Sequence, residues 1–258
     1  MDLKLTGKTA VVTGASRGIG LATVRTLIDE GVRVVGAART ITPEFRDTGA
    51  HPVAADLSTP EGVTLLIDTA LTELGGIDLL VNNVGGGNGT TVGFDQADDA
   101  VWMRAFELNL LATVRATRAA LPSLIERRGA IVNISSISGL VPGAFPVTGA
   151  VSAAITAFGK SVSEEFGPRG VRVNTVSPSM VNTTAFRDPN GEFAQWAAAA
   201  DVTVDELIQR LIKDERVTAG RITEPEEVAA LIAFLLSDVA GNITGGNHLI
   251  DGGMNKTV

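Results

Sequence analysis

The sequence predicts a single α/β domain in which a doubly wound parallel sheet lies between two layers of helices. Short β-branched runs alternate with longer helical patterns, as in βαβ units. The run at residues 77–81 is largely apolar, which is typical of a parallel strand that is buried on both faces. The length of 258 residues and the hydrophobic content of 45% suit one large core.

The expected elements alternate along the whole chain. Strands are predicted at residues 9–13, 32–38, 52–55, 77–81, 130–134, 171–176 and 247–250. Helices are predicted at residues 19–30, 60–74, 98–127, 152–166 and 224–236, and a polar helical insertion at 183–216. In a sheet of this kind, the ligand binds in the crevice beyond the carboxyl ends of the strands.

The composition argues against several classes of function. Cysteine is absent and only two histidines occur, so we expect neither a disulfide nor a metal site. The net charge of −8 argues against nucleic-acid binding. No apolar run approaches the roughly 18 residues of a membrane span, and no signal peptide is visible. We therefore expect a cytoplasmic protein that binds a small-molecule substrate and contacts no membrane.

A glycine-rich segment (residues 13–20, TGASRGIG) follows the first predicted strand and opens the first helix. Gly14 permits a tight turn, Gly18 lets the backbone approach a pyrophosphate, and Gly20 lets the helix pack closely on the strand. The helix N-terminus offers free N–H groups to phosphates. A plain glycine-rich turn is the alternative, but the strand–turn–helix context favours a dinucleotide.

The glycine spacing GxxxGxG, together with the segment NNVG (residues 82–85), resembles the short-chain dehydrogenase/reductase family. The resemblance covers nearly the whole chain and implies an oxidoreductase with a Rossmann-type fold. Its further motifs are Asp56, Asn109, residues 133–136 (NISS), residues 172–174 leading into Pro178, and residues 251–253 (DGG).

The resemblance implies that Asp56 contacts an adenine and that residues 82–85 line the nucleotide groove. Taken singly, Asp56 would rather be a turn or helix-cap residue, and Asn82 and Asn83 would form a turn. The predicted cofactor-binding residues are Gly14, Ser16, Arg17, Gly18, Ile19, Gly20, Arg39, Asp56, Leu57, Asn83, Gly85 and Pro178.

The charge after the second strand favours NADP(H) over NAD(H). NAD enzymes place an acid there, against the ribose 2′-hydroxyl. In the family register this position is Ala38, and Arg39 follows it. A guanidinium suits a 2′-phosphate, and Arg17 could add a second cation. The alternative is that both arginines are ordinary surface charges.

The family's proton-transfer pair is missing. Members use a serine, a tyrosine and a lysine four residues after it, supported by an asparagine on the long helix. Ser136 and Asn109 match, but Thr148 occupies the tyrosine position and Ser152 the lysine position, and the chain contains no tyrosine. Lys160 lies about two helical turns beyond and should not reach this point. Threonine and serine donate hydrogen bonds but are poor acids at neutral pH.

Residues 183–216, hereafter the lid segment, correspond to the family's substrate lid. Its carboxylates could supply a proton or form a solvated face, and its aromatic residues could contact an apolar substrate or pack together. The candidates are Asp188, Glu192, Asp201, Asp205 and Glu206, with Phe186, Phe193 and Trp196. The glycine-rich segment 85–89 could widen the pocket or simply turn the chain.

Three functions remain open from the sequence. The first is an NADP(H)-dependent oxidoreductase acting on a carbonyl, imine or alcohol, in which Ser136 and Thr148 bond the substrate oxygen through a modified proton relay. The second is a non-redox lyase, isomerase or cyclase, and the third is an inactive binding protein. A further explanation for the missing tyrosine and lysine is that they were replaced by engineering. The resemblance also implies a homotetramer.

Overall fold

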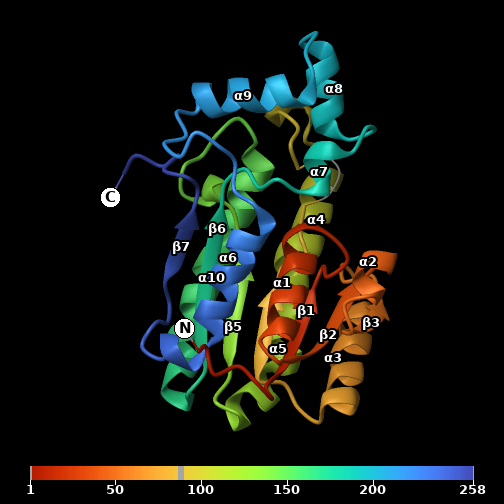
Figure 1. Cartoon of the computed structure of the whole chain (residues 1–258), viewed down its shortest axis with the longest axis vertical. Coiled ribbons are helices and arrows are strands. Elements are labelled where there is room, and N and C mark those ends of the chain that lie inside the picture. Colours follow the sequence, from red (N-terminus) through yellow and green to blue (C-terminus); the bar gives the residue numbers. More distant parts are fainter. Residues whose placement is uncertain (1, 87–89, 258) are drawn as a thin grey trace.

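The computed structural model describes residues 2–86 and 90–257, so residues 87–89 of the glycine-rich segment lie outside it. The parallel strands form one sheet in the order β3-β2-β1-β4-β5-β6-β7 (Figure 1). Their bounds are β1 Thr9–Thr13, β2 Arg33–Ala38, β3 His51–Ala54, β4 Leu79–Asn82, β5 Ala130–Ile134, β6 Arg172–Pro178 and β7 Asn247–Ile250. The predicted fold class is confirmed. The order reverses between β1 and β4, where a doubly wound sheet opens a crevice.

Helices cover both faces of the sheet (Figure 1). On β1, Ala10 and Val12 point into the core shared with α1 (Gly18–Asp29) and α10 (Pro225–Leu236). Val11 points into the opposite core, formed with α3 (Pro60–Leu74), α5 (Ala112–Glu126) and α6 (Pro146–Phe166). The two-residue period of a strand thus explains why both faces of β1 are apolar. The remaining α-helices that the structure describes before the lid segment are α2 (Pro43–Arg46) and α4 (Asp99–Ala105).

Two predicted helices differ from the structure in ways that bear on the site. The long helix is interrupted between α4 and α5 by a π-helical segment, η2 (Phe106–Leu111), which contains Asn109. The helix expected near 152–166 begins at Pro146 instead. Proline suits the first helical position because its missing N–H would have no partner there. Thr148 therefore lies in the first turn of α6 and not in a preceding loop.

The lid segment forms α7 (Thr184–Arg187), α8 (Glu192–Ala199) and α9 (Val204–Asp214), beyond the carboxyl ends of the strands (Figure 1). Its aromatic residues pack together: the rings of Phe186 and Phe193 are 3.9 Å apart, and those of Phe193 and Trp196 4.9 Å. This favours the packing alternative over direct substrate contact.

Most candidate lid carboxylates have structural partners. Asp205 pairs with Arg187, Glu206 completes a capping box at the start of α9, and Asp188 accepts the N–H of Asn190 at 2.9 Å. These contacts favour the interpretation of these carboxylates as a polar surface over a role as proton donors. Within residues 2–86 and 90–257, no helix is long and apolar enough to cross a membrane, and no cluster of three metal-ligating side chains occurs.

Candidate active site

A cleft of about 760 Å³ lies where the strands end. It is lined by nearly all of the predicted site residues: Gly14, Ser16, Arg17, Gly18, Ile19, Arg39, Asp56, Leu57, Asn83, Gly85, Asn109, Ser136, Thr148 and Ser152. Segments far apart in the sequence therefore meet in one place, as the motifs predicted. Gly20 and Pro178 do not line the cleft.

The glycine loop is held by backbone geometry. Gly14 has a φ of +68°, in the left-handed region that favours glycine. A side chain at Gly20 would place its Cβ 2.1 Å from the carbonyl oxygen of Gly14, so Gly20 packs α1 against the loop and stays out of the cleft. The Asn83 amide donates to the carbonyls of Thr13 at 2.9 Å and Gly14 at 3.1 Å. Asn83 therefore fastens the end of β4 to the glycine loop.

The N-terminus of α1 opens toward the cleft. Arg17 occupies the N-cap position and its side chain makes no capping hydrogen bond to the first turn. Gly18, at φ +54°, adds no side chain over this turn, so a ligand can approach the backbone closely. Uncapped N–H groups and the positive end of the helix dipole form an anion-binding site. The residues present therefore fit the pyrophosphate of a dinucleotide.

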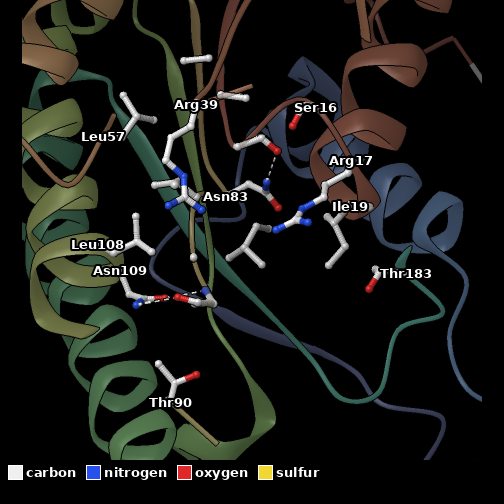
Figure 2. A pocket seen from close by; sticks show the side chains of 18 of the residues that line it. Ser16, Arg17, Ile19, Arg39, Leu57, Asn83, Thr90, Leu108, Asn109 and Thr183 are labelled. Atoms are coloured by element: carbon white, nitrogen blue, oxygen red, sulfur yellow. Dashed lines mark hydrogen bonds between the residues drawn. The ribbon is translucent and has the colours of Figure 1, made fainter. Parts of the chain in front are cut away.

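Two guanidinium groups extend into the same end of the cleft. Arg17 comes from the glycine loop and Arg39 from the end of β2, and both side chains point toward the opening (Figure 2). Asp56 lies close by: the hydroxyl and backbone N–H of Ser58 lower the pKa of its carboxyl group, and the charge of Arg39 adds to this. Asp56 is thus a turn residue that also lines the cleft. Its interpretation as a turn residue is therefore compatible with its predicted contact to an adenine.

The opposite end, hereafter the substrate end, presents hydroxyl groups. The Ser136 oxygen accepts the backbone N–H of Ser138 at 3.2 Å. The Thr148 hydroxyl donates to the carbonyl oxygen of Thr90 at 2.7 Å. Ser152 is only 6% exposed, and among the described residues its hydroxyl has no hydrogen-bond partner, although its carbonyl accepts the Ser135 hydroxyl at 2.9 Å.

Asn109 fixes a loop. Its side-chain oxygen accepts the N–H of Gly86 at 2.8 Å, while its nitrogen donates to the carbonyl of Ala105 at 2.8 Å and weakly to that of Gly86 at 3.4 Å (Figure 2). A Cβ at Gly85 would lie 2.9 Å from the Asn109 oxygen. Both amide atoms are thus committed to the backbone, which holds Gly85 and Gly86 against the cleft.

Charged side chains are absent from the described lining of the substrate end. The cleft's charged lining residues are Arg17, Arg39 and Asp56, all at the glycine-loop end. Lys160, expected not to reach this place, pairs with Glu164 on the exposed face of α6. A carboxylate of the lid segment lies nearby: Glu192 accepts the hydroxyl of Thr91 at 2.5 Å.

Pro178, which was expected in the cofactor site, does not line the cleft, and its contact with a cofactor stays a prediction. Pro178 is buried at the end of β6, where it pairs in register with Ile250 of β7. Ser179 continues this pairing by donating its N–H to the Ile250 carbonyl at 3.3 Å. Thr183 and Thr184 line the cleft instead, and the sequence analysis did not single them out. Their hydroxyl pair at the start of the lid segment was the available signal.

A family model described as enoyl-(acyl carrier protein) reductase matches residues 14–255. The chain belongs to the short-chain dehydrogenase/reductase family. It is an oxidoreductase of that type. The match includes the glycine loop, the hydroxyl residues of the substrate end and the lid segment, so the whole cleft belongs to the shared domain.

Relatives cover the chain almost completely. The chain is 33% identical to the 3-oxoacyl-(acyl-carrier-protein) reductase of Vibrio cholerae, over 98% of this chain and 99% of that one. It is 34% identical to 3beta-hydroxysteroid dehydrogenase 1 of Eggerthella lenta, over 98% and 95%. The crystal structure of L-sorbose reductase from Gluconobacter frateurii, complexed with NADPH and L-sorbose, superposes with a TM-score of 0.91 at 31% identity, covering both chains fully.

Proposed function

We propose that the chain is an NADP(H)-dependent oxidoreductase that acts on a carbonyl, imine or alcohol without the tyrosine–lysine pair of its family. One observation carries the proposal: a single cleft joins the uncapped helix N-terminus and two arginines to the hydroxyls of Ser136, Thr148 and Ser152. The relation to a reductase that binds NADPH supports it.

The glycine-loop end suits the phosphate form of the cofactor. The first turn of α1 would hold the pyrophosphate, and Arg17 and Arg39 would bind the 2′-phosphate. Asp56 and Leu57 would border the adenine, and Asn83 and Gly85 would line the groove toward the nicotinamide. Once bound, NADP(H) supplies or accepts the hydride at the substrate end.

Proton transfer at the substrate end would differ from that of the family. No described lining residue there is ionisable at neutral pH. Among residues 2–86 and 90–257, the Ser152 hydroxyl has no hydrogen-bond partner, so it can donate to a substrate atom. The proton itself would come from water or from the substrate. Losing a positioned general acid typically costs about 10²–10⁴ in rate, so ordinary carbonyl reduction should be slow.

The decisive experiment compares the natural chain with a Thr148→Tyr/Ser152→Lys variant on a panel of carbonyls, imines and alcohols, following NADPH oxidation and NADP⁺ reduction. Turnover by the natural chain supports the proposal. Turnover by the variant alone would mean that the cofactor site is functional but that redox chemistry has been given up.

A second class of function stays a candidate because the described lining of the substrate end contains no charged side chain. A lyase, isomerase or cyclase would retain the pocket but oxidise no cofactor, and an inactive binding protein would bind ligand without turnover. Tight NADPH binding combined with no turnover by the natural chain on any panel member would favour these candidates.

Assembly and location complete the proposal. We expect a cytoplasmic homotetramer built through α4 and α5, α6 and β7, with the alanine- and glycine-rich residues 149–159 allowing close helix approach. Light scattering at micromolar concentration measures the mass directly, and a monomeric mass would contradict the tetramer.

A further inference from the structure

The direction of one hydrogen bond limits what the substrate end can bind. A carbonyl oxygen carries no proton, so in the bond between Thr148 and the Thr90 carbonyl the threonine must be the donor. The bond is short at 2.7 Å, which is typical of a good O–H···O interaction. With its proton committed, the Thr148 hydroxyl presents lone pairs to the cleft that it lines. It therefore accepts a hydrogen bond from a ligand and does not donate one.

The charges around this end favour a cation. Glu192 is bonded to Thr91, one residue from the carbonyl that holds Thr148. The lid segment as a whole carries seven carboxylates and four cations, and the chain has a net charge of −8. No described lining residue of the substrate end carries a positive charge that would repel a cation. A negative field over a neutral pocket raises the local concentration of cationic ligands.

The missing acid points to the same chemistry. Hydride addition to a neutral carbonyl leaves an alkoxide, which needs a proton and a charged or strongly polar partner. Asn109 cannot serve because both its amide atoms are bonded to backbone. Hydride addition to a protonated C=N group neutralises the charge that is already present. That reaction needs a hydrogen-bond acceptor for the N–H group and no general acid. The Thr148 hydroxyl oxygen is such an acceptor.

We propose that the substrate end binds a protonated imine whose N–H group donates to the Thr148 hydroxyl oxygen. The proposal rests on the proposed function and narrows its substrate class. In the reaction, one hydride forms the new C–H bond, the C=N double bond becomes a single bond, and its electron pair stays on nitrogen. The nitrogen keeps its proton, the product is a neutral amine, and NADPH is oxidised to NADP⁺.

Binding tests the inference independently of turnover. Calorimetry with NADP⁺ present would compare pyrrolidine, which is a donating cation at neutral pH, with cyclopentanone, which only accepts. We expect pyrrolidine to bind at least about tenfold more tightly, since a hydrogen bond from a charged donor is lost for the ketone. Thr148→Val should abolish this preference, whereas Thr148→Ser, which keeps the hydroxyl, should retain it.

Turnover provides the second test, with 2-methyl-1-pyrroline and cyclopentanone as matched five-membered rings and NADPH as reductant. We expect the imine to have a kcat/KM at least about tenfold above that of the ketone, falling as pH rises and the imine loses its proton. Thr148→Val should lower the imine kcat/KM about tenfold and Thr148→Ser much less.

The outcomes separate this inference from the proposed function. Equal or faster reduction of cyclopentanone, or a pyrrolidine affinity that Thr148→Val leaves unchanged, would overturn the protonated-imine assignment while leaving the redox function standing. Reduction of neither compound despite NADPH binding would overturn both.

Discussion

The two ends of the cleft are built on different principles. At the glycine-loop end, the N-terminus of α1 and the side chains of Arg17 and Arg39 line the cleft, so backbone groups and fixed charges would bind the proposed cofactor. At the substrate end, neutral hydroxyls on α6 and after β5 line the wall. A backbone site persists through most substitutions, whereas a side-chain site changes with each one. Under the proposed function, this difference explains how the glycine-loop end keeps its family pattern while the substrate end works without the family's tyrosine–lysine pair.

The largest expected effect is that of Gly20→Ala at the glycine-loop end. Its Cβ would lie 2.1 Å from the Gly14 carbonyl oxygen, so the loop and α1 must separate. We expect loss of NADPH binding and a fall of about 3 kcal/mol in the free energy of unfolding, as for severe overpacking. Fluorescence titration and denaturant unfolding measure both. Gly167→Ala, which has open space around it, is the matched control and should change neither. Normal NADPH affinity in Gly20→Ala would show that the loop does not depend on backbone packing.

Arg39→Asp should separate the two forms of the cofactor. Losing a charge-assisted bond and gaining a repulsive carboxylate should weaken NADPH binding about 100-fold, with NADH affected only a few-fold. Arg46→Asp makes the same charge change on α2, outside the cleft lining, and serves as the control. Equal losses for NADPH and NADH would mean that Arg39 does not recognise the 2′-phosphate.

Glu192→Gln probes whether the substrate end depends on the lid segment. The amide keeps the shape and can still bond the Thr91 hydroxyl, but the charge is lost. We expect the KM for a cationic substrate to rise about fivefold, with kcat and NADPH affinity nearly unchanged. Glu215→Gln, which removes the same charge at the end of α9, should have little effect. A change in NADPH affinity would show that the two ends are coupled.

The smallest effect is expected away from both ends. Bonds from the Arg221 guanidinium lower the pKa of Glu227, at the start of α10, to about 2, and the backbone N–H of Glu224 adds to this. In the unfolded chain the pKa of a glutamate is about 4.3. The lowered pKa of Glu227 therefore stabilises the folded state fully above that pH, and this stabilisation is lost as the pH falls toward 2. The melting temperature of Glu227→Gln should therefore lie below that of the natural chain at pH 7, and the gap should close in acid. A gap that stays constant from pH 7 to pH 3 would contradict this.

The sequence predicted most of the fold because strand and helix periodicity is local information. The bounds of α3, β5 and β7 agree with prediction to the residue. The start of α6 was missed because the glycine and small residues around 149 weaken the helical pattern, although Pro146 already marks a first helical position. Motif order reveals which segments meet but not which atoms face the cleft, so the predicted cofactor contact of Pro178 is left to a binding experiment.

The sequence by itself determined the family, the sheet and the cofactor end, since glycine spacing and the charge at residue 39 act through the backbone and through long-range charge. It also determined that the tyrosine is absent. Only the tertiary structure decided which hydrogen bonds the Thr148 hydroxyl makes, because the direction of a hydroxyl bond depends on its partner. Thr90 lies far from Thr148 in sequence, yet its carbonyl takes the Thr148 proton and turns that hydroxyl into an acceptor. The same folding bonds the Asn109 amide to Gly86 and places Ser152 in the lining of the cleft.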